Sequence, residues 1–114
     1  MSQTPARSHP ALGLDDVVHQ RVRLALLSVL VETGQAEFTY LRQLLELSDG
    51  NLGKHLNALS QAGYVELRKQ PAAQGRARTW ARVTRKGRRA FRDELTALEE
   101  LIANHRRTEQ HHDG

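Results

Sequence analysis

One stretch of this chain, residues 38–83, constrains the fold most, because four elements follow one another there in a fixed order. Two short helices come first, and each carries leucines at helical spacing. These are Leu41, Leu44 and Leu45 in the first helix and Leu52, Leu56 and Leu59 in the second. Residues 64–70 and 76–83 then alternate between apolar and polar side chains around the turn Pro71–Gly75, which predicts a β-hairpin. The predicted fold class is therefore α+β.

Capping residues mark the ends of the predicted elements. An amphipathic helix begins at Asp15, and a long last helix follows the hairpin. The expected caps are Gly34 after the first helix, Thr39 and then Ser48 or Asp49 before the two short helices, Gly63 after the second, and Thr84 before the last helix. We expect a flexible arm over residues 1–13, one folded domain over 14–104 and a disordered tail over 105–114.

Length and composition exclude several classes of protein. A chain of 114 residues suits one domain, and the absence of cysteine excludes disulfides and thiolate metal sites. No apolar run has membrane-spanning length, so we expect a cytoplasmic protein. Nucleophile-elbow, phosphate-loop and HExxH motifs are absent too, and we expect no enzymatic activity, no cofactor and no bound metal.

Positive charge is concentrated in residues 66–92. This segment holds ten Lys or Arg residues and one acid, Glu66, which gives 10 − 1 = +9 in a chain whose net charge is +4. The remainder therefore carries 4 − 9 = −5. Solvated surfaces usually mix both signs, so this asymmetry favours a polyanionic partner for one face.

The second short helix has a polar face opposite its leucines. That face comprises Gly50, Asn51, Lys54, His55, Asn57, Ala58 and Gln61. Asn and Gln pair bidentately with adenine, and Lys binds guanine or phosphate. Gly50 and Gly53 each weaken a helix by about 1 kcal/mol relative to alanine. We therefore expect another backbone to approach closely at each, the preceding helix at Gly53 and DNA at Gly50.

A helix-turn-helix followed by a basic hairpin is the plan of a winged helix-turn-helix. The predicted unit has a three-helix core, a two-stranded wing and a long C-terminal helix. Such a unit places its second short helix, here residues 49–62, in the major groove of double-stranded DNA. Its wing, here residues 69–78, reaches the backbone or the minor groove.

Three segments of the chain are DDVVHQRVRLALLSVL, FTYLRQLLELSDGNLGKHLNALSQAGYVEL and RARTWARVTRKGRRAF. Together they resemble the compact winged-helix transcriptional regulators related to the MarR and ArsR families. The resemblance covers about residues 14–102, and its more specific motifs are D-G-N-L-x-K-H-L-x-x-L-x-x-A-G-Y-V and R-T-W-x-x-V-T-x-x-G. The resemblance implies a homodimeric, repressor-type DNA binder. By matched position it implies DNA contacts from Asn51, Lys54, His55, Arg76 and Arg78. Arg21 stands where similar proteins often have proline, and we expect it either to leave the first helix straighter or to add a basic group, without a threat to the fold.

The wing and the last helix add further candidate contacts. Arginine is drawn into a narrow minor groove, which favours the wing residues. The last helix carries cations in its first turns, where they oppose the helix dipole, and an external anion such as phosphate would explain that placement. The full set of expected DNA contacts is Thr39, Tyr40, Ser48, Gly50, Asn51, Lys54, His55, Asn57, Lys69, Arg76, Arg78 and Lys86.

The last helix also carries an apolar stripe that a small core cannot cover completely. Its residues are Phe91, Leu95, Leu98, Leu101 and Ile102. We expect a homodimer through this stripe, because DNA readers of this size gain a second half-site by dimerising. The outward-facing Trp80 is expected to be structural.

Two alternative functions stay open. One is a winged helix that binds an acidic protein surface instead of DNA. The other is a metal-responsive sensor of the ArsR type, with ligands from His105, Glu109, His111 and His112. The sequence does not identify a small-molecule effector.

Overall fold

The computed structural model describes residues 9–72 and 75–112. Its helices are the 3-10 helix η2 (Pro10–Gly13) and the α-helices α1 (Asp16–His19), α2 (Arg21–Thr33), α3 (Phe38–Leu44), α4 (Asp49–Gln61) and α5 (Arg85–His112). Its strands are β1 (Gln35–Glu37), β2 (Val65–Gln70) and β3 (Arg78–Val83). They form one antiparallel sheet in the order β1-β3-β2, so β1 adds a third strand to the predicted wing hairpin.

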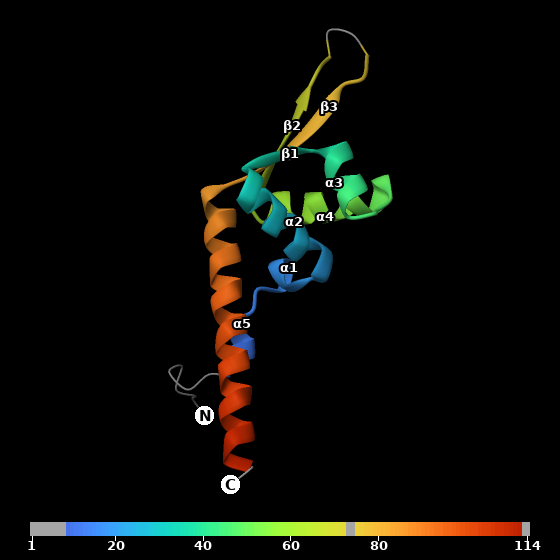
Figure 1. The fold of residues 1–114 in the computed structure, drawn as a ribbon. Helices are drawn as coiled ribbons and strands as arrows, with labels where there is room; N and C mark the ends of the chain where they lie inside the picture. Colours follow the sequence, from blue (N-terminus) through green and yellow to red (C-terminus); the bar gives the residue numbers. More distant parts are fainter. Residues whose placement is uncertain (1–8, 73–74, 113–114) are drawn as a thin grey trace.

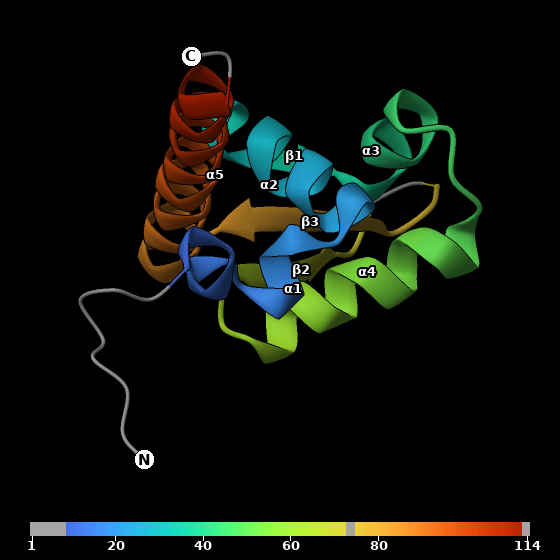
Figure 2. The same cartoon turned by 90° about the horizontal axis from the view of Figure 1, so that it is seen from below.

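The molecule is elongated, with extents of 67 × 32 × 22 Å. Helices α1 to α4 form a small body beside the sheet, and the β2–β3 wing projects from one end of it (Figure 1). Helix α5 lies along one side of the body and extends past it, and the view from below shows α5 and α4 on different sides (Figure 2). The wing, α4 and α5 therefore present three separate surfaces.

Local chemistry sets the ends of α4 as the sequence predicts. Ser48 is the N-cap, and its Oγ accepts a hydrogen bond from the Asn51 amide at 3.1 Å. Gly63 follows the helix with φ of +83°, a conformation that favours glycine. Leu52, Leu56 and Leu59 are buried in the core, which directs the opposite side of the helix outward.

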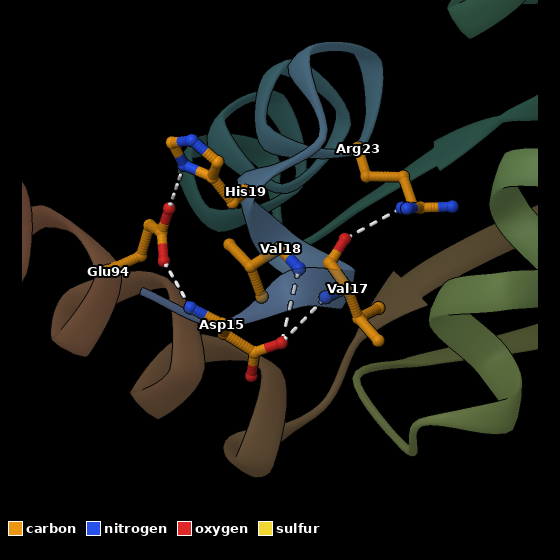
Figure 3. Close-up of polar contacts among 6 residues, drawn as sticks. All are labelled: Asp15, Val17, Val18, His19, Arg23 and Glu94. Atoms are coloured by element: carbon orange, nitrogen blue, oxygen red, sulfur yellow. Dashed lines mark hydrogen bonds and ion pairs between the residues drawn. The ribbon is translucent and has the colours of Figure 1, made fainter. Parts of the chain in front are cut away.

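The first predicted helix is interrupted, so of the two expectations for Arg21 the straighter helix is wrong, while Arg21 does add an exposed basic group. Gln20 is extended, and its Oε1 accepts hydrogen bonds from the amides of Val22 and Arg23 at 2.8 and 3.0 Å, so α2 starts anew at Arg21. Arg23 Nε donates to the Val17 carbonyl at 2.7 Å across the break (Figure 3). The side-chain cap competes with helix continuation and turns α1 relative to α2.

Three further expectations differ from the structure. The α3 N-cap is Glu37 rather than Thr39, because residues 35–37 pair with β3 until the helix begins. Nothing among the described residues lies within 4 Å of a Cβ built at Gly53, so α3 does not approach there. Helix α5 continues past Asn104 to His112, in a segment rich in helix-forming Arg, Glu and Gln.

The predicted N-terminal arm is likewise shorter than expected at its inner end. Residues 10–13 form η2, which packs on α5 at Ala97. The rest of the predicted arm, residues 1–8, and the last two residues of the predicted tail lie outside the described residues.

Helix α5 is joined to the body at its first turn. Thr84 caps it by accepting a hydrogen bond from the Gly87 amide at 2.9 Å, and the Thr84 hydroxyl donates to the Gly63 carbonyl at 2.7 Å. Gly87 is buried, and a Cβ there would overlap the backbone carbonyl of Tyr64. Only glycine allows this helix to lie so close to the start of β2.

His55 is expected from the sequence on the exposed face of α4, and this placement is wrong. Only 9% of the residue is exposed, and its Nδ1 is buried with no hydrogen-bond partner among the described residues. Burial lowers the pKa of His55 below 6.5, and the positive charges of Arg23 and Lys54 lower it further. His55 therefore lies on the buried side of α4, and its imidazole is neutral there.

Replacing Gly87 with alanine should destabilise the fold. The added methyl group forces the α5 backbone and the Tyr64 carbonyl apart, and overpacking of this kind costs about 1–3 kcal/mol. The free energy of unfolding in urea, measured for both proteins, tests this. Gly53→Ala is the control, because its methyl group meets no neighbour and should stabilise α4 by about 1 kcal/mol. Equal stability of Gly87→Ala and wild type would contradict the close contact.

Stability should fall as the pH falls below about 6.5, in part because of His55. The unfolded chain binds the His55 proton more tightly than the folded protein, so lowering the pH through this range favours unfolding. Urea unfolding of wild type and His55→Gln at about pH 8 and pH 5 measures the effect. The wild type should lose more stability than the variant, whereas an equal loss in both proteins would show that His55 is not buried in its neutral form.

Candidate nucleic-acid interface

Eleven of the twelve side chains expected to contact DNA are exposed, and the exception is His55. They come from four elements. Thr39 and Tyr40 lie in the first turn of α3, Lys86 in the first turn of α5, and the rest at α4 and the wing: Ser48, Gly50, Asn51, Lys54 and Asn57 at α4, and Lys69, Arg76 and Arg78 at the wing.

The exposed side of α4 forms a continuous polar strip. Gly50, Lys54, Asn57 and Gln61 recur at spacings of four, three and four, so they lie on one side of the helix, and Asn51 is exposed beside them. The single acid of this helix, Asp49, contacts Arg42 Nε through its Oδ1 at 3.1 Å. A Cβ at Gly50 would meet no described heavy atom within 4 Å, which leaves the helix backbone open to approach.

A hollow of about 820 Å³ separates the start of α3 from the wing. It is lined by Glu37, Phe38 and Thr39 on one side and by wing residues 70–72 and 75–79 on the other. Thr39, Arg76 and Arg78 therefore surround one groove. Arg78 Nε lies 3.3 Å from Glu37 Oε2, and this ion pair ties the base of the wing to the end of β1.

The basic side chains of residues 66–92 are all exposed but do not share one face. Arg68, Arg78 and Arg82 lie on the outer face of the sheet, since Ala81 and Val83 of the same strand point into the core. The expectation that this whole cluster serves one polyanion-binding face is therefore too broad.

Two of the four cations at the start of α5, Lys86 and Arg88, have an internal explanation. Arg88 Nη1 donates to the Val31 carbonyl in the last turn of α2 at 3.1 Å. The Lys86 side chain packs against Gly63 just beyond α4, with Nζ 5.7 Å from the centre of the Tyr64 ring. Both cations lie at the C-terminal ends of other helices, where the backbone dipole attracts positive charge. An external anion is not needed to account for them.

Trp80 lies on the outer face of the sheet between Arg78 and Arg82, as predicted. The residue is half-buried, and its Nε1 donates to Gln70 Oε1 on the neighbouring strand at 3.0 Å. This cross-strand contact supports the base of the wing.

A buried polar network between α1, α5 and the end of α4 was not anticipated from the sequence. Glu94 of α5 accepts a hydrogen bond from the Asp15 amide and contacts His19, and the Tyr64 hydroxyl donates to Asp15 Oδ2 at 2.6 Å. The hydrogen bond to Asp15, together with burial and the negative charge of Asp15, raises the pKa of Tyr64 to about 12. Glu94 shares helical spacing with Phe91 and Leu98, which is the signal that would have placed it inside.

The apolar stripe on α5 is only partly covered. Leu95 and Ile102 are 42% and 51% exposed, while Phe91, Leu98 and Leu101 are half-buried. An unpaired stripe of this kind is open to a partner surface.

The histidines of the last helix do not form a metal site within the described part of the chain. No three side chains among His, Cys, Asp and Glu gather there as such a site requires, although His105 and Glu109 lie 3.7 Å apart. The side chains of His111 and His112 lie outside the description. None of the helices within residues 9–72 and 75–112 is long and apolar enough to cross a membrane.

Known proteins are similar to this chain in sequence and in architecture. Residues 22–102 match the winged helix DNA-binding domain family. Uncharacterized protein MJ0432 of Methanocaldococcus jannaschii is 39% identical over 83 residues, which span 73% of this chain and 89% of that protein.

Solved structures agree with this assignment. A transcriptional regulator homologue from Pyrococcus horikoshii OT3 has a TM-score of 0.71 at 27% identity, with 77% of this chain and 86% of that chain covered. The putative transcriptional regulator ytfH from Salmonella typhimurium shares the fold at 20% identity, with a TM-score of 0.64 over 98% and 94% of the two chains. The present chain belongs to the winged helix DNA-binding domain family.

Proposed function

We propose that the protein is a homodimeric, repressor-type transcriptional regulator that binds a two-fold symmetric site in double-stranded DNA. Helix α4 enters the major groove, and Asn51, Lys54 and Asn57 contact base edges. The wing residues Lys69, Arg76 and Arg78 contact the backbone or the minor groove. Thr39, Tyr40, Ser48 and Lys86 contact phosphates, and Gly50 lets a DNA backbone come close. Such a regulator acts in the cytoplasm, where its DNA target lies.

One observation carries this proposal: the polar strip of α4 is exposed, and Thr39, Arg76 and Arg78 line a separate groove between α3 and the wing. The strip offers amide and ammonium donors on a helix, which suits the width and the hydrogen-bonding pattern of the major groove. The acid of this helix, Asp49, is paired with Arg42, which offsets part of the negative charge at the start of the helix.

The α5 stripe supports a two-fold dimer. Phe91, Leu95, Leu98 and Ile102 are spaced by four, three and four residues, a pattern that is the same when read from either end. Two antiparallel α5 helices therefore place Leu95 of each copy opposite Leu98 of the other. A self-complementary contact of this kind is what two-fold symmetry requires, and it would cover the exposed part of the stripe.

Selection of bound duplexes from a random pool tests the helix and the symmetry together. The wild type should recover a palindromic consensus with two half-sites. Asn51→Ala should relax one position in each half-site by about 1–3 kcal/mol of discrimination, and Lys54→Ala should weaken binding. Asn104→Ala on α5 is the control and should select the same consensus as the wild type. An unchanged consensus and affinity for both α4 variants would show that α4 does not read DNA.

The wing should contribute affinity without sequence preference. The double variant Arg76→Ala, Arg78→Ala should weaken binding to all duplexes, and the slope of log K against log salt should fall by about 0.9 for each phosphate that the variant no longer neutralises. The double variant Arg106→Ala, Arg107→Ala removes the same charge from the exposed far part of α5 and should leave the slope unchanged. Equal slopes for the two double variants would assign the salt dependence to net charge alone.

A further inference from the structure

Glu94 is a buried carboxylate at the place where α5 crosses the start of α1. Only 1% of the residue is exposed. Its Oε1 accepts a hydrogen bond from the Asp15 amide at 3.0 Å, and its Oε2 lies 2.9 Å from His19 Nδ1 (Figure 3). Both carboxylate oxygens are therefore partnered, as a buried charge requires.

The network continues from Glu94 to the end of α4. Asp15 Oδ1 caps α1 by accepting hydrogen bonds from the amides of Val17 and Val18 at 2.8 and 3.3 Å. Asp15 Oδ2 accepts the hydroxyl hydrogen of Tyr64, the residue that precedes β2 and follows α4. A chain of short polar contacts thus links α5, through α1, to the segment that leaves α4.

This network gives α5 a second point of attachment. The first lies at the start of the helix, where Gly87 packs on the Tyr64 carbonyl. Glu94 lies two helical turns further on, about 10 Å along the axis. Between and beside these points α5 is also held by packing, because Ala90 and Phe91 lie against the core and η2 packs at Ala97. Beyond the first turn of α5, the Glu94 hydrogen bonds are the contacts that require a particular direction.

A carboxylate is an expensive residue at this position if its role is packing alone. Removing one partner of a buried hydrogen bond is destabilising, yet a well-packed apolar side chain is often at least as stable as a buried polar group with its partners. What the polar contacts add is direction, because they require one angle between α5 and α1.

From these contacts we propose that Glu94 is a positioning residue that fixes the angle between α5 and α4 and thereby sets the spacing of the two DNA half-sites that the dimer accepts. The part concerning DNA rests on the proposed function. The part concerning the angle is a property of one protomer.

Lever geometry shows that the angle matters. From Gly87 to Arg106, α5 is about 28 Å long, so a pivot of about 10° at Gly87 moves Arg106 by about 5 Å relative to the body. In the proposed antiparallel dimer the two-fold axis passes between Leu95 and Leu98, about 14 Å from Gly87, so the same pivot in both copies changes the separation of the two bodies by up to about 5 Å. Neighbouring base pairs lie only about 3.4 Å apart along the duplex. A pivot of this size therefore shifts the spacing by about one base pair.

The angle can be measured directly, because the chain has no cysteine. Spin labels at Gln43→Cys on α3 and Arg106→Cys on α5 report the distance between the body and far α5 in one protomer. Labelled protein is mixed with an excess of unlabelled protein, so that distances between protomers do not contribute. The wild type should give a narrow distance distribution by pulsed electron resonance.

Three variants remove parts of the network. Glu94→Leu removes both contacts of the carboxylate. Tyr64→Phe removes the hydrogen bond from the Tyr64 hydroxyl to Asp15, and His19→Ala removes the contact between the partly exposed imidazole and Glu94. Each should broaden or shift the distribution, by up to about 5 Å for Glu94→Leu. Glu94→Gln keeps an acceptor for the Asp15 amide and should restore most of the narrow distribution.

The control is His105→Ala, which removes an exposed histidine of α5 that contacts Glu109 instead of Glu94. It should leave the distribution unchanged. If Glu94→Leu unfolds the protein, Tyr64→Phe and His19→Ala decide the matter, because both alter only one end of the network. Narrow, unshifted distributions in the folded variants would overturn the proposal for the angle.

Binding to duplexes with different half-site spacings tests the consequence. The wild type should prefer one spacing, and the network variants should lose about fivefold or more of that preference while keeping their affinity for a single half-site. An unchanged preference in variants with broadened distributions would overturn the role in spacing. Failure of the wild type to bind any duplex would instead overturn the proposed function, and the distance measurement would still report on Glu94.

Discussion

The backbone carbonyl of Tyr64 is the contact on which the arrangement of the whole molecule depends. It accepts a hydrogen bond from the Thr84 amide at 3.0 Å, and Gly87 packs directly against it. Tyr64 follows α4 and precedes β2, while Thr84 connects β3 to α5. This hydrogen bond therefore joins the segment between α4 and β2 to the segment between β3 and α5. This junction sets where α4, the wing and α5 meet, and it has no room for a side chain on Gly87.

Some of the cations in the second half of the chain contact other parts of the protein, and others face only solvent. Arg88 and Lys86 lie at the C-terminal ends of α2 and α4, so their placement at the start of α5 follows from the dipoles of its neighbours. Arg78 pairs with Glu37 and steadies the wing. Net charge read from the sequence counts all of these residues alike. The groove that Thr39 and Arg76 line is a narrower and better defined candidate surface than the basic segment as a whole.

The parts of the fold that could be predicted from the sequence are those set by local chemistry. Ser48, Gly63 and Thr84 cap helices as expected, because each acts on backbone groups a few residues away. The strand β1 depends on a distant partner, β3, which no local pattern records. The break at Gln20 is local, but glutamine is not among the preferred N-cap residues, so the sequence does not mark it.

Two buried polar residues show where helical periodicity outweighs residue type. His55 is three residues after Leu52 and four before Leu59, which places it on the inward side of α4. Glu94 holds the same relation to Phe91 and Leu98 on α5. Residue type alone predicts that both lie on the surface, because Glu is rarely buried and His is often exposed. The prediction fails for Glu94 because its carboxylate has hydrogen-bond partners, and for His55 because its imidazole is neutral. The face of α4 that the sequence predicts to be polar is exposed except at His55, which is buried, and Ala58, which is half-buried.

The two helices to which we assign function are held in different ways. Helix α4 is backed by Leu52, Leu56 and Leu59, and burial of such side chains contributes about 1.5–3 kcal/mol each without a preferred direction. Helix α5 keeps part of its apolar stripe exposed, and besides the packing of Ala90 and Phe91 it is held by the close contact at Gly87 and the hydrogen bonds of Glu94. Apolar packing is enough to hold α4 with its outer side open to solvent. In the proposed dimer, α5 would set the distance between two copies of the chain and would need a defined angle, which hydrogen bonds provide.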